Sequence, residues 1–179
     1  MINNDIKNIL ISKEQIQGKV KLLGEEISRD YKDRELLLVC ILKGSLMFMA
    51  DLMKYINTYV EIDFMGVSSY GNSIISSGQV RIMKDLDMSV EGKDILIVED
   101  IIDTGITLNY ICNYIKGKGA KSVEIITLLD KPSGRKVNID AKYKGFKVGN
   151  EFVVGYGLDY AEKYRNLSYI GVLDESVYK

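Results

Sequence analysis

The chain has 179 residues, of which 46% are hydrophobic and 27% charged, which fits one compact domain with a sizeable core. Its 24 basic and 25 acidic residues are mixed along the sequence and leave a net charge of −1, so nucleic acid is disfavoured as a partner. The chain contains no histidine, which excludes Ser-His-Asp and Cys-His hydrolysis, histidine-ligated zinc and histidine acid-base catalysis. A metal would need oxygen ligands, and Mg²⁺ suits them best.

The N-terminal segment lacks the features of a secretory signal. The residues MINNDIKNILISKEQ have no cationic start, and no apolar run reaches the ~18 residues of a membrane span. We therefore expect a soluble, cytoplasmic protein with no membrane partner. Cys40 and Cys112 fall in apolar stretches and are interpreted as core residues, not as a disulfide or metal pair.

The chain begins with a predicted helix and a predicted strand. Ser12 and Gln15 can form a capping box, and the helix that follows should end between Asp30 and Arg34. Its apolar stripe consists of Ile16, Val20, Leu23 and Ile27. Residues 36–42, LLLVCIL, predict a strand buried on both faces, which ends in polar residues at 43–45.

The next segment is predicted to form a helix, a strand and a long loop. The helix has an apolar face made of Leu46, Met49, Ala50 and Met53. Residues 58–67 alternate in part and predict a strand, with Val60, Ile62 and Phe64 on one side. Residues 68–79, SSYGNSIISSGQ, predict a mobile loop for which a lid is one hypothesis, and residues 80–83 predict a returning strand.

Residues 94–108, DILIVEDIIDTGITL, are the most informative segment. Residues 94–98 predict another doubly buried strand, which stops at Glu99 and Asp100. A helix is expected from Thr107, with the apolar stripe Leu108, Ile111, Cys112 and Ile115. Residues 103–107 then lie at its N-terminus, where free N–H groups favour a phosphate, while the two acids suit sugar hydroxyls or Mg²⁺. Taken alone, the pattern also fits a plain capped helix in a doubly wound protein.

The order of elements predicts the fold. Residues 122–129 give another buried strand ending at Asp130 and Lys131, and ligands of open parallel sheets bind outside the carboxyl ends of strands. Lys43, residues 99–107 and Lys131 could therefore share one site. We expect an α/β fold with a doubly wound, mainly parallel sheet flanked by helices. Residues 1–179 should form a single domain, with a core of about residues 30–130 and a small hood built from the N-terminal segment and about residues 131–170.

The sequence of residues 99–107, EDIIDTGIT, resembles the phosphoribosyl pyrophosphate (PRPP) motif of type I phosphoribosyltransferases. In family order, the likeness extends to the hypoxanthine and hypoxanthine-guanine phosphoribosyltransferases. It is carried by Leu42-Lys43-Gly44-Ser45, Ser69-Tyr70, residues 99–107, Lys131, FVVGYGLDY at 152–160, and Arg165. The resemblance implies an Mg²⁺-dependent purine salvage enzyme that transfers ribose phosphate from PRPP to hypoxanthine, with guanine as a further substrate, and releases pyrophosphate.

The resemblance also implies roles on the PRPP side of the site. Glu99 and Asp100 would hold the ribose hydroxyls, and Asp103 would take or share the proton of the purine ring nitrogen. The alternative for Asp103 is a helix cap. The phosphate pocket would consist of Asp103, Thr104, Gly105, Ile106 and Thr107.

The remaining roles concern pyrophosphate, purine and metal. Pyrophosphate would contact Lys43, Gly44 and Arg165, and in the family the peptide joining residues like Leu42 and Lys43 can be cis. The purine would contact Lys131, Phe152, Val153 and Asp159. Mg²⁺ would be held by Glu99, Asp100 and Asp159. The loop at Ser69 and Tyr70 would close over PRPP. Arg135 matches the pyrophosphate side of the family too loosely to be included among the predicted site residues.

Base preference and assembly are less determined. Lys131 would donate to the purine 6-oxo oxygen, so adenine should be rejected because its amino group cannot accept that hydrogen bond. A xanthine-preferring transferase and an RNA-binding pyrimidine regulator with the same PRPP cradle remain as alternatives. A PRPP synthase would need a longer chain and an ATP site. By resemblance we expect a homodimer or homotetramer.

Overall fold

The computed structural model describes residues 2–69 and 80–178. Its elements are η1 (Ile2–Asp5), β1 (Ile6–Ile11), α1 (Lys13–Asp30), β2 (Leu36–Leu42), α2 (Leu46–Leu52), η2 (Met53–Tyr55), β3 (Val60–Ser69), β4 (Val80–Lys84), β5 (Asp94–Ile102), α3 (Ile106–Gly117), β6 (Ser122–Asp130), η3 (Pro132–Gly134), β7 (Tyr143–Lys147), β8 (Val153–Val154), β9 (Ile170–Leu173) and α4 (Glu175–Tyr178).

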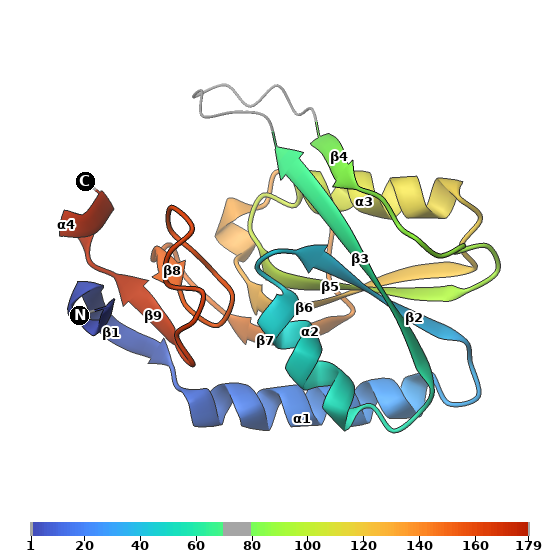
Figure 1. The fold of residues 1–179 in the computed structure, drawn as a ribbon, viewed down its shortest axis with the longest axis horizontal. Helices are drawn as coiled ribbons and strands as arrows, with labels where there is room; N and C mark the ends of the chain where they lie inside the picture. The colour runs from blue at the N-terminus through green and yellow to red at the C-terminus, as the bar shows by residue number, and fades with distance from the viewer. Residues whose placement is uncertain (1, 70–79, 179) are drawn as a thin grey trace.

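A six-stranded sheet forms the centre of the molecule, with the strand order β4-β3-β2-β5-β6-β7. All neighbouring pairs are parallel except β3 and β4, which are antiparallel. Helices α1 and α2 lie on one side of the sheet and α3 lies on the other (Figure 1). The predicted α/β fold with a doubly wound, mainly parallel sheet is confirmed.

The central strands are buried on both faces, as their continuous apolar runs predict. In β2, Leu38 and Cys40 pack into the core on the α1 side, whereas Leu37 and Val39 pack into the core on the α3 side. β5 divides its side chains between the two cores in the same way. Cys40 and Cys112 are free and buried, and burial raises the pKa of the Cys112 thiol to about 11, so both behave as core residues.

A second, three-stranded sheet has the order β1-β9-β8 and lies at one end of the molecule together with both chain ends (Figure 1). Strand β1 pairs antiparallel with β9, so residues 6–11 contact residues 170–173. Strand β8 pairs antiparallel with the other edge of β9. The division of the chain into a core and a hood stays a prediction.

The start of α1 is marked by a capping box, as the sequence predicts. Ser12 accepts a hydrogen bond from the Gln15 N–H at 3.3 Å, while the Gln15 side chain accepts one from the Ser12 N–H at 2.8 Å. This capping box and the stripe Ile16, Val20, Leu23 and Ile27 are as predicted.

Strands β1 and β7 were not predicted from the sequence, because short edge strands carry weak periodicity.

Three local predictions were wrong. Strand β5 does not stop at Glu99, because its ladder to β6 continues through Ile101 and Ile102. Helix α3 begins at Ile106, one residue before the predicted start. The buried face of α2 is Phe48, Met49 and Leu52, and not Leu46, Met49, Ala50 and Met53, of which Leu46 is 47% exposed. A short helix that is apolar nearly all round does not reveal which face meets the sheet.

The predicted loop at 68–79 is only partly described. Residues 68 and 69 belong to β3, and their backbone pairs with β4, so the loop begins later than predicted. Tyr70 and the rest of the Ser/Gly-rich segment lie outside the described residues, and the lid hypothesis stays a prediction. Within the described residues, no helix is long and apolar enough to cross a membrane.

Candidate active site

The candidate site lies where the direction of winding changes in the large sheet. The chain leaves β2 toward β3 on one side, whereas it leaves β5 toward β6 on the other. Because β2 and β5 are parallel neighbours, their carboxyl ends open a crevice between the two connections. Strand β2 ends at Leu42 and is followed by Lys43, whereas β5 ends at Ile102 and is followed by Asp103.

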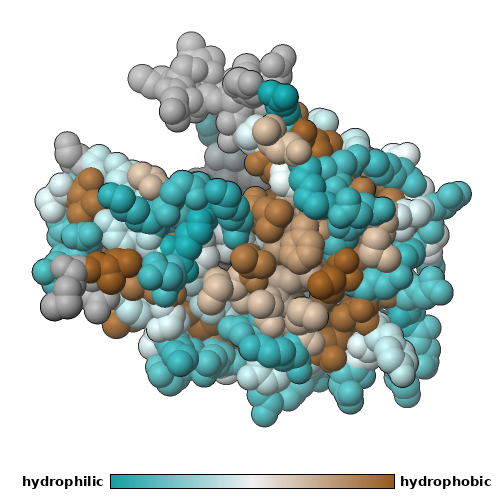
Figure 2. All heavy atoms as spheres, viewed as in Figure 1, coloured by the Kyte–Doolittle hydropathy of each residue, from teal (hydrophilic) through white to brown (hydrophobic). Residues whose placement is uncertain are grey.

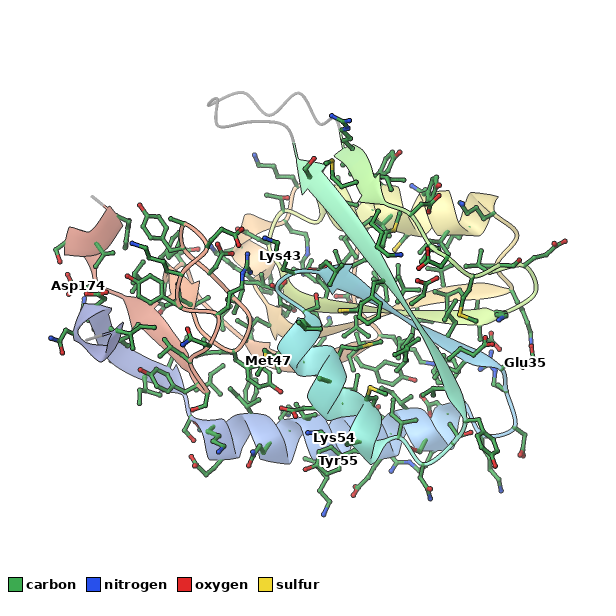
Figure 3. The ribbon with its side chains drawn as sticks, viewed as in Figure 1. Glu35, Lys43, Met47, Lys54, Tyr55 and Asp174 are labelled. Atoms are coloured by element: carbon green, nitrogen blue, oxygen red, sulfur yellow. The ribbon has the colours of Figure 1, made fainter. Side chains whose placement is uncertain are left out.

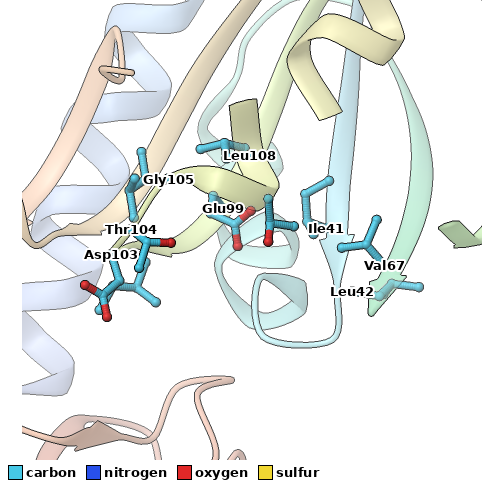
Figure 4. A pocket seen from close by; sticks show the side chains of 11 residues that line it. Ile41, Leu42, Val67, Glu99, Asp103, Thr104, Gly105 and Leu108 are labelled. Atoms are coloured by element: carbon cyan, nitrogen blue, oxygen red, sulfur yellow. The ribbon is translucent and has the colours of Figure 1, made fainter. Parts of the chain in front are cut away.

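A pocket of about 270 Å³ occupies this crevice. Figure 4 shows Asp103, Thr104 and Gly105 on one side, Glu99 in the middle, and Leu42 on the opposite side. The full lining consists of Ile41, Leu42, Val67, Glu99, Ile101, Ile102, Asp103, Thr104, Gly105, Thr107 and Leu108. The structure thus brings most of the predicted PRPP motif to one pocket.

The turn before α3 leaves backbone donors free. Gly105 is the N-cap residue with a φ of 77° and offers no side-chain cap, and a Cβ there would lie 2.5 Å from Ile139 Cγ2. Among the described residues, the one side-chain acceptor for these first N–H groups is Thr104 Oγ1, which lies 3.4 Å from the Ile106 nitrogen. The first N–H groups of the helix therefore remain available to an anion.

Glu99 and Asp100 are adjacent, half-buried acids near the end of β5. Burial, reinforced by the charge of Asp100, raises the pKa of Glu99 well above its ordinary value. Burial also raises the pKa of Asp100, although hydrogen bonds from Glu99 and the Ile101 N–H, together with the charge of Arg165, oppose the shift. Two crowded carboxylates with raised pKa values would gain stability from a cation or from hydroxyl donors.

Gly44 lets the loop after β2 approach these acids. A Cβ on Gly44 would lie 1.6 Å from Asp100 Oδ2, and a Cβ on Gly157 would lie 2.0 Å from the Gly44 carbonyl oxygen. Gly157 has a φ of 102°, which favours glycine. The peptide between Leu42 and Lys43 is cis, as the resemblance implied. Gly44 therefore contacts both Asp100 and Gly157, and it joins the end of β5 to the segment after β8.

Asp103 and Lys131 come together although they follow different strands. Lys131 Nζ lies 3.6 Å from Asp103 Oδ2, and the Lys131 N–H donates to the Ile102 carbonyl at 3.0 Å. Gly134 crowds the same carboxylate, since a Cβ there would lie 1.7 Å from Asp103 Oδ1. The site therefore presents a cationic donor and a carboxylate acceptor side by side.

Arg135 supports the turn that carries Asp103. Its Nη1 donates to the carbonyls of Ile102 and Asp103 at 2.6 and 2.7 Å, and its Nη2 pairs with Asp130. Arg135 was not predicted as a site residue, because its match to the pyrophosphate side of the family is loose. In the structure it is a positioning residue beneath the PRPP motif, and only its contacts across 32 and 33 residues reveal this.

Lys43 follows β2 on the side of the large sheet that faces the small sheet (Figure 3). Its Nζ forms an ion pair with Glu162 at 3.0 Å. Arg165 pairs with Asp159 at 2.9 Å and with the same Glu162 at 3.3 Å. The two cations predicted to bind pyrophosphate are thus joined by one acid that the sequence analysis did not single out.

Of the predicted purine contacts, Phe152 belongs to an aromatic group outside the lining of the pocket. The Phe152 ring stacks on Tyr178 with centroids 5.0 Å apart and meets Tyr160 edge-on at 5.6 Å. Phe152 is 40% exposed, whereas Val153 is buried. The structure therefore leaves part of the Phe152 ring accessible, but it does not bring Phe152 into the pocket that holds Glu99.

The predicted metal ligands are not gathered in one place. Glu99 and Asp100 are adjacent, whereas Asp159 pairs with Arg165. In the parts of the chain that the structure describes, no three acidic or cysteine side chains are arranged to hold a metal ion. A cation here would therefore need to complete its ligands with oxygens of a bound substrate.

Comparison with known proteins is consistent with this geometry. A family model, the phosphoribosyl transferase domain, matches residues 6–161. The chain is 61% identical to the hypoxanthine-guanine phosphoribosyltransferase of Bacillus subtilis (strain 168) over 179 residues, which is 100% of this chain and 99% of that protein. It is 54% identical to the protein of that name from Streptococcus thermophilus (strain CNRZ 1066), with 99% of each chain covered.

The fold is likewise shared with solved structures. A crystal structure of a hypoxanthine phosphoribosyltransferase from Staphylococcus aureus superposes with a TM-score of 0.96 at 53% identity, covering 99% of this chain and 96% of that one. A hypoxanthine-guanine phosphoribosyltransferase from Bacillus anthracis gives a TM-score of 0.90 at 47% identity, with 94% and 99% covered.

Proposed function

The chain belongs to the phosphoribosyl transferase family, and we propose that it acts in purine salvage as a hypoxanthine-guanine phosphoribosyltransferase. It transfers the phosphoribosyl group of PRPP to hypoxanthine or guanine and releases pyrophosphate. One observation carries the assignment: the 61% identity to the Bacillus subtilis enzyme extends over the whole chain. The names of the relatives favour neither a xanthine-preferring transferase nor an RNA-binding regulator.

The pocket supports a role in binding PRPP. The free N–H groups at the start of α3 and the hydroxyls of Thr104 and Thr107 would bind the ribose phosphate. Glu99 and Asp100 would accept hydrogen bonds from the ribose hydroxyls, which would relieve the crowding that raises both pKa values. The remaining members of the phosphate pocket, Asp103, Gly105 and Ile106, would contribute through their backbone.

The donor set also fits Mg²⁺. Glu99 and Asp100 offer the oxygen ligands that this cation prefers, in a place where burial and the charge of Asp100 raise the pKa of Glu99. When bound, Mg²⁺ would neutralise charge on the pyrophosphate group as it leaves. Lys43 and Arg165 would bind pyrophosphate from the other side. Asp159, which pairs with Arg165, would be an outer partner of the metal.

The Asp103 and Lys131 pair supports oxopurine recognition. On an oxopurine, the 6-oxo oxygen and the neighbouring ring nitrogen lie on one edge. Lys131 can donate to the oxygen while Asp103, 3.6 Å away, accepts or shares the proton of the nitrogen. Adenine carries an amino group in place of the oxygen, which leaves the Lys131 donor unpaired. Phe152 would stack on the base, and Val153 would offer backbone hydrogen bonds.

The test is conversion of hypoxanthine, guanine, xanthine and adenine to nucleotides in the presence of PRPP and Mg²⁺. Wild-type protein should convert the first two. Asp103→Asn should lower kcat by about 10²- to 10⁴-fold, with Asp140→Asn as the control for loss of an exposed acid. Lys131→Ala should lose the preference against adenine, with Lys32→Ala as its control. Wild-type protein that binds PRPP but converts no purine would contradict the assignment.

The exposed apolar face of the molecule supports self-association as a homodimer or homotetramer. Figure 2 shows brown and tan atoms gathered over α2 and the adjoining part of β3, and Met47 and Tyr55 lie on this side (Figure 3). The exposed apolar residues of α2, η2 and β3 are Leu46, Met47, Met53, Tyr55 and Ile62. The neighbouring Asp51–Lys54 ion pair gives the face both charges, which suits contact with a second copy of itself.

Light scattering after gel filtration tests this assembly. The wild-type mass should be a multiple of 20.2 kDa, and Met47→Glu should shift it toward the monomer because it places a charge in an apolar contact. Tyr59→Glu is the control, since Tyr59 is 99% exposed and lies outside α2 and η2. A monomeric wild type, or an unchanged Met47→Glu assembly, would contradict the proposal. A cytoplasmic location also stays a prediction.

A further inference from the structure

One carboxylate bridges the two cations assigned to pyrophosphate. Glu162 Oε2 lies 3.0 Å from Lys43 Nζ, and Glu162 Oε1 lies 3.3 Å from Arg165 Nη2. Each oxygen takes one cation, as the oxygens of a bound phosphate group would do. Lys43 and Glu162 are 119 residues apart in sequence, so the contact joins the loop after β2 to the turn after β8.

The turn that carries Glu162 has a defined conformation. Ala161 and Glu162 have φ values of 51° and 63°, in the left-handed region that most residues avoid. The Glu162 N–H donates to Asp159 Oδ2 at 2.9 Å, and Tyr160 and Lys163 form a bridge across the turn. Backbone contacts therefore aim the Glu162 side chain toward the cations.

Arg165 has further partners besides Glu162. Arg165 also pairs with Asp159 and donates to the Gly157 carbonyl at 2.8 Å. Its Nε is buried without a hydrogen-bond partner among the described residues. The ion pairs with Lys43 and Arg165 favour the charged form of the Glu162 carboxylate. A negative group is thus already present at the place assigned to pyrophosphate.

The bridge is well suited to being displaced. The side chains of Lys43 and Glu162 are each 65% exposed, and exposed ion pairs are weak because water screens them. Pyrophosphate carries more charge than one carboxylate, and with Mg²⁺ it offers more contacts. The substrate group can therefore displace Glu162, but it must compete with it.

We propose that Glu162 is an internal competitor for the pyrophosphate site, which pairs with Lys43 and Arg165 in the empty enzyme and weakens the binding of PRPP and pyrophosphate. The inference rests on the proposed function, because that function assigns these two cations to pyrophosphate. By returning to the cations, Glu162 also assists the departure of pyrophosphate after transfer.

Calorimetric titration with magnesium pyrophosphate tests the inference directly. Glu162→Gln keeps the shape of the side chain and removes its charge, so Kd for pyrophosphate should fall about three- to tenfold. The KM for PRPP should fall in parallel, whereas the KM for hypoxanthine should stay the same. Glu91→Gln is the matched control, because it removes one exposed glutamate charge far from the site and should change none of these values.

A double-mutant cycle separates competition from a structural role. In a Lys43→Ala background, Glu162→Gln should tighten pyrophosphate binding less than in wild type, because one of the cations that Glu162 masks is gone. Unchanged or weaker pyrophosphate binding in Glu162→Gln, while the wild type converts hypoxanthine, overturns this inference and leaves the proposed function standing. Wild-type protein that neither converts a purine nor binds pyrophosphate overturns both.

Discussion

The two ends of strand β5 use acidic residues in opposite ways. At the start of the strand, Asp94 has a side chain only 2% exposed, and it accepts hydrogen bonds from Arg34 at 2.7 and 2.9 Å and from Ser122 at 2.5 Å. At the other end, Glu99 and Asp100 crowd each other. One strand therefore carries a satisfied acid at one end and an incompletely compensated pair of acids at the other.

The pKa values express this difference. Burial alone would raise the pKa of Asp94, but the hydrogen bonds from Ser122 and Arg34 outweigh it, and the pKa lies below its ordinary value. Burial raises the pKa of Glu99, and the charge of Asp100 adds to the shift. Stability is thus supplied at the amino end of the sheet and given up at the carboxyl end, where a ligand can compensate the charge.

The largest effect is expected at the carboxyl end, from Gly44→Ala. The added Cβ would lie 1.6 Å from Asp100 Oδ2, so the acid or the loop after β2 must move. A displacement of this size should lower kcat/KM for PRPP by about 100-fold. Gly18→Ala is the control, because nothing lies within 4 Å of its Cβ. Steady-state kinetics check this, and near-normal activity of Gly44→Ala would show that the close approach is not needed.

A change at the amino end should alter stability and leave catalysis intact. Arg34→Met removes the main partner of Asp94 and should lower the free energy of unfolding by about 2 kcal/mol. The loss stays below the 3–5 kcal/mol of fully buried pairs, because the Arg34 side chain is 37% exposed and Lys121 remains 3.5 Å from Asp94. Urea unfolding measures the loss, and Lys32→Met is the control. A large drop in kcat would contradict the separation of the two ends.

The smallest effect is a gain in stability from Glu99→Gln that depends on pH. Because the folded state raises the pKa of Glu99, ionised Glu99 destabilises the fold above its unfolded pKa of about 4.3. The penalty is complete once the pH exceeds the folded pKa. Glu99→Gln should therefore stabilise the protein by about 1 kcal/mol at pH 8, and by nothing below pH ~4, where Glu99 is protonated in both states.

Unfolding of Glu99→Gln and wild type across this pH range checks the sign. Asp94 provides the opposite slope, since its lowered pKa contributes stability that is lost as the pH falls through its folded pKa. A stabilisation by Glu99→Gln that is the same at pH 8 and pH 4 would show that packing, and not charge, explains it.

The sequence by itself determined the local elements and the phosphate-binding turn. The apolar runs of β2 and β5, the capping box at Ser12 and the stripe of α3 are read from neighbours within a few positions, where helix and strand periods act. The motif at 99–107 and the segment 152–160 carried the family, because their residue types and order are specific. The comparisons confirmed that prediction.

Only the tertiary structure decided how these parts meet. The continuation of β5 past Glu99 depends on its ladder with β6, and the contact of Gly44 with Asp100 depends on the register of β2 beside β5. Arg135 beneath Asp103 and Glu162 between Lys43 and Arg165 join residues that no local pattern connects. Long-range contacts follow from sheet order and chain crossing, and these are properties of the packed chain rather than of any segment.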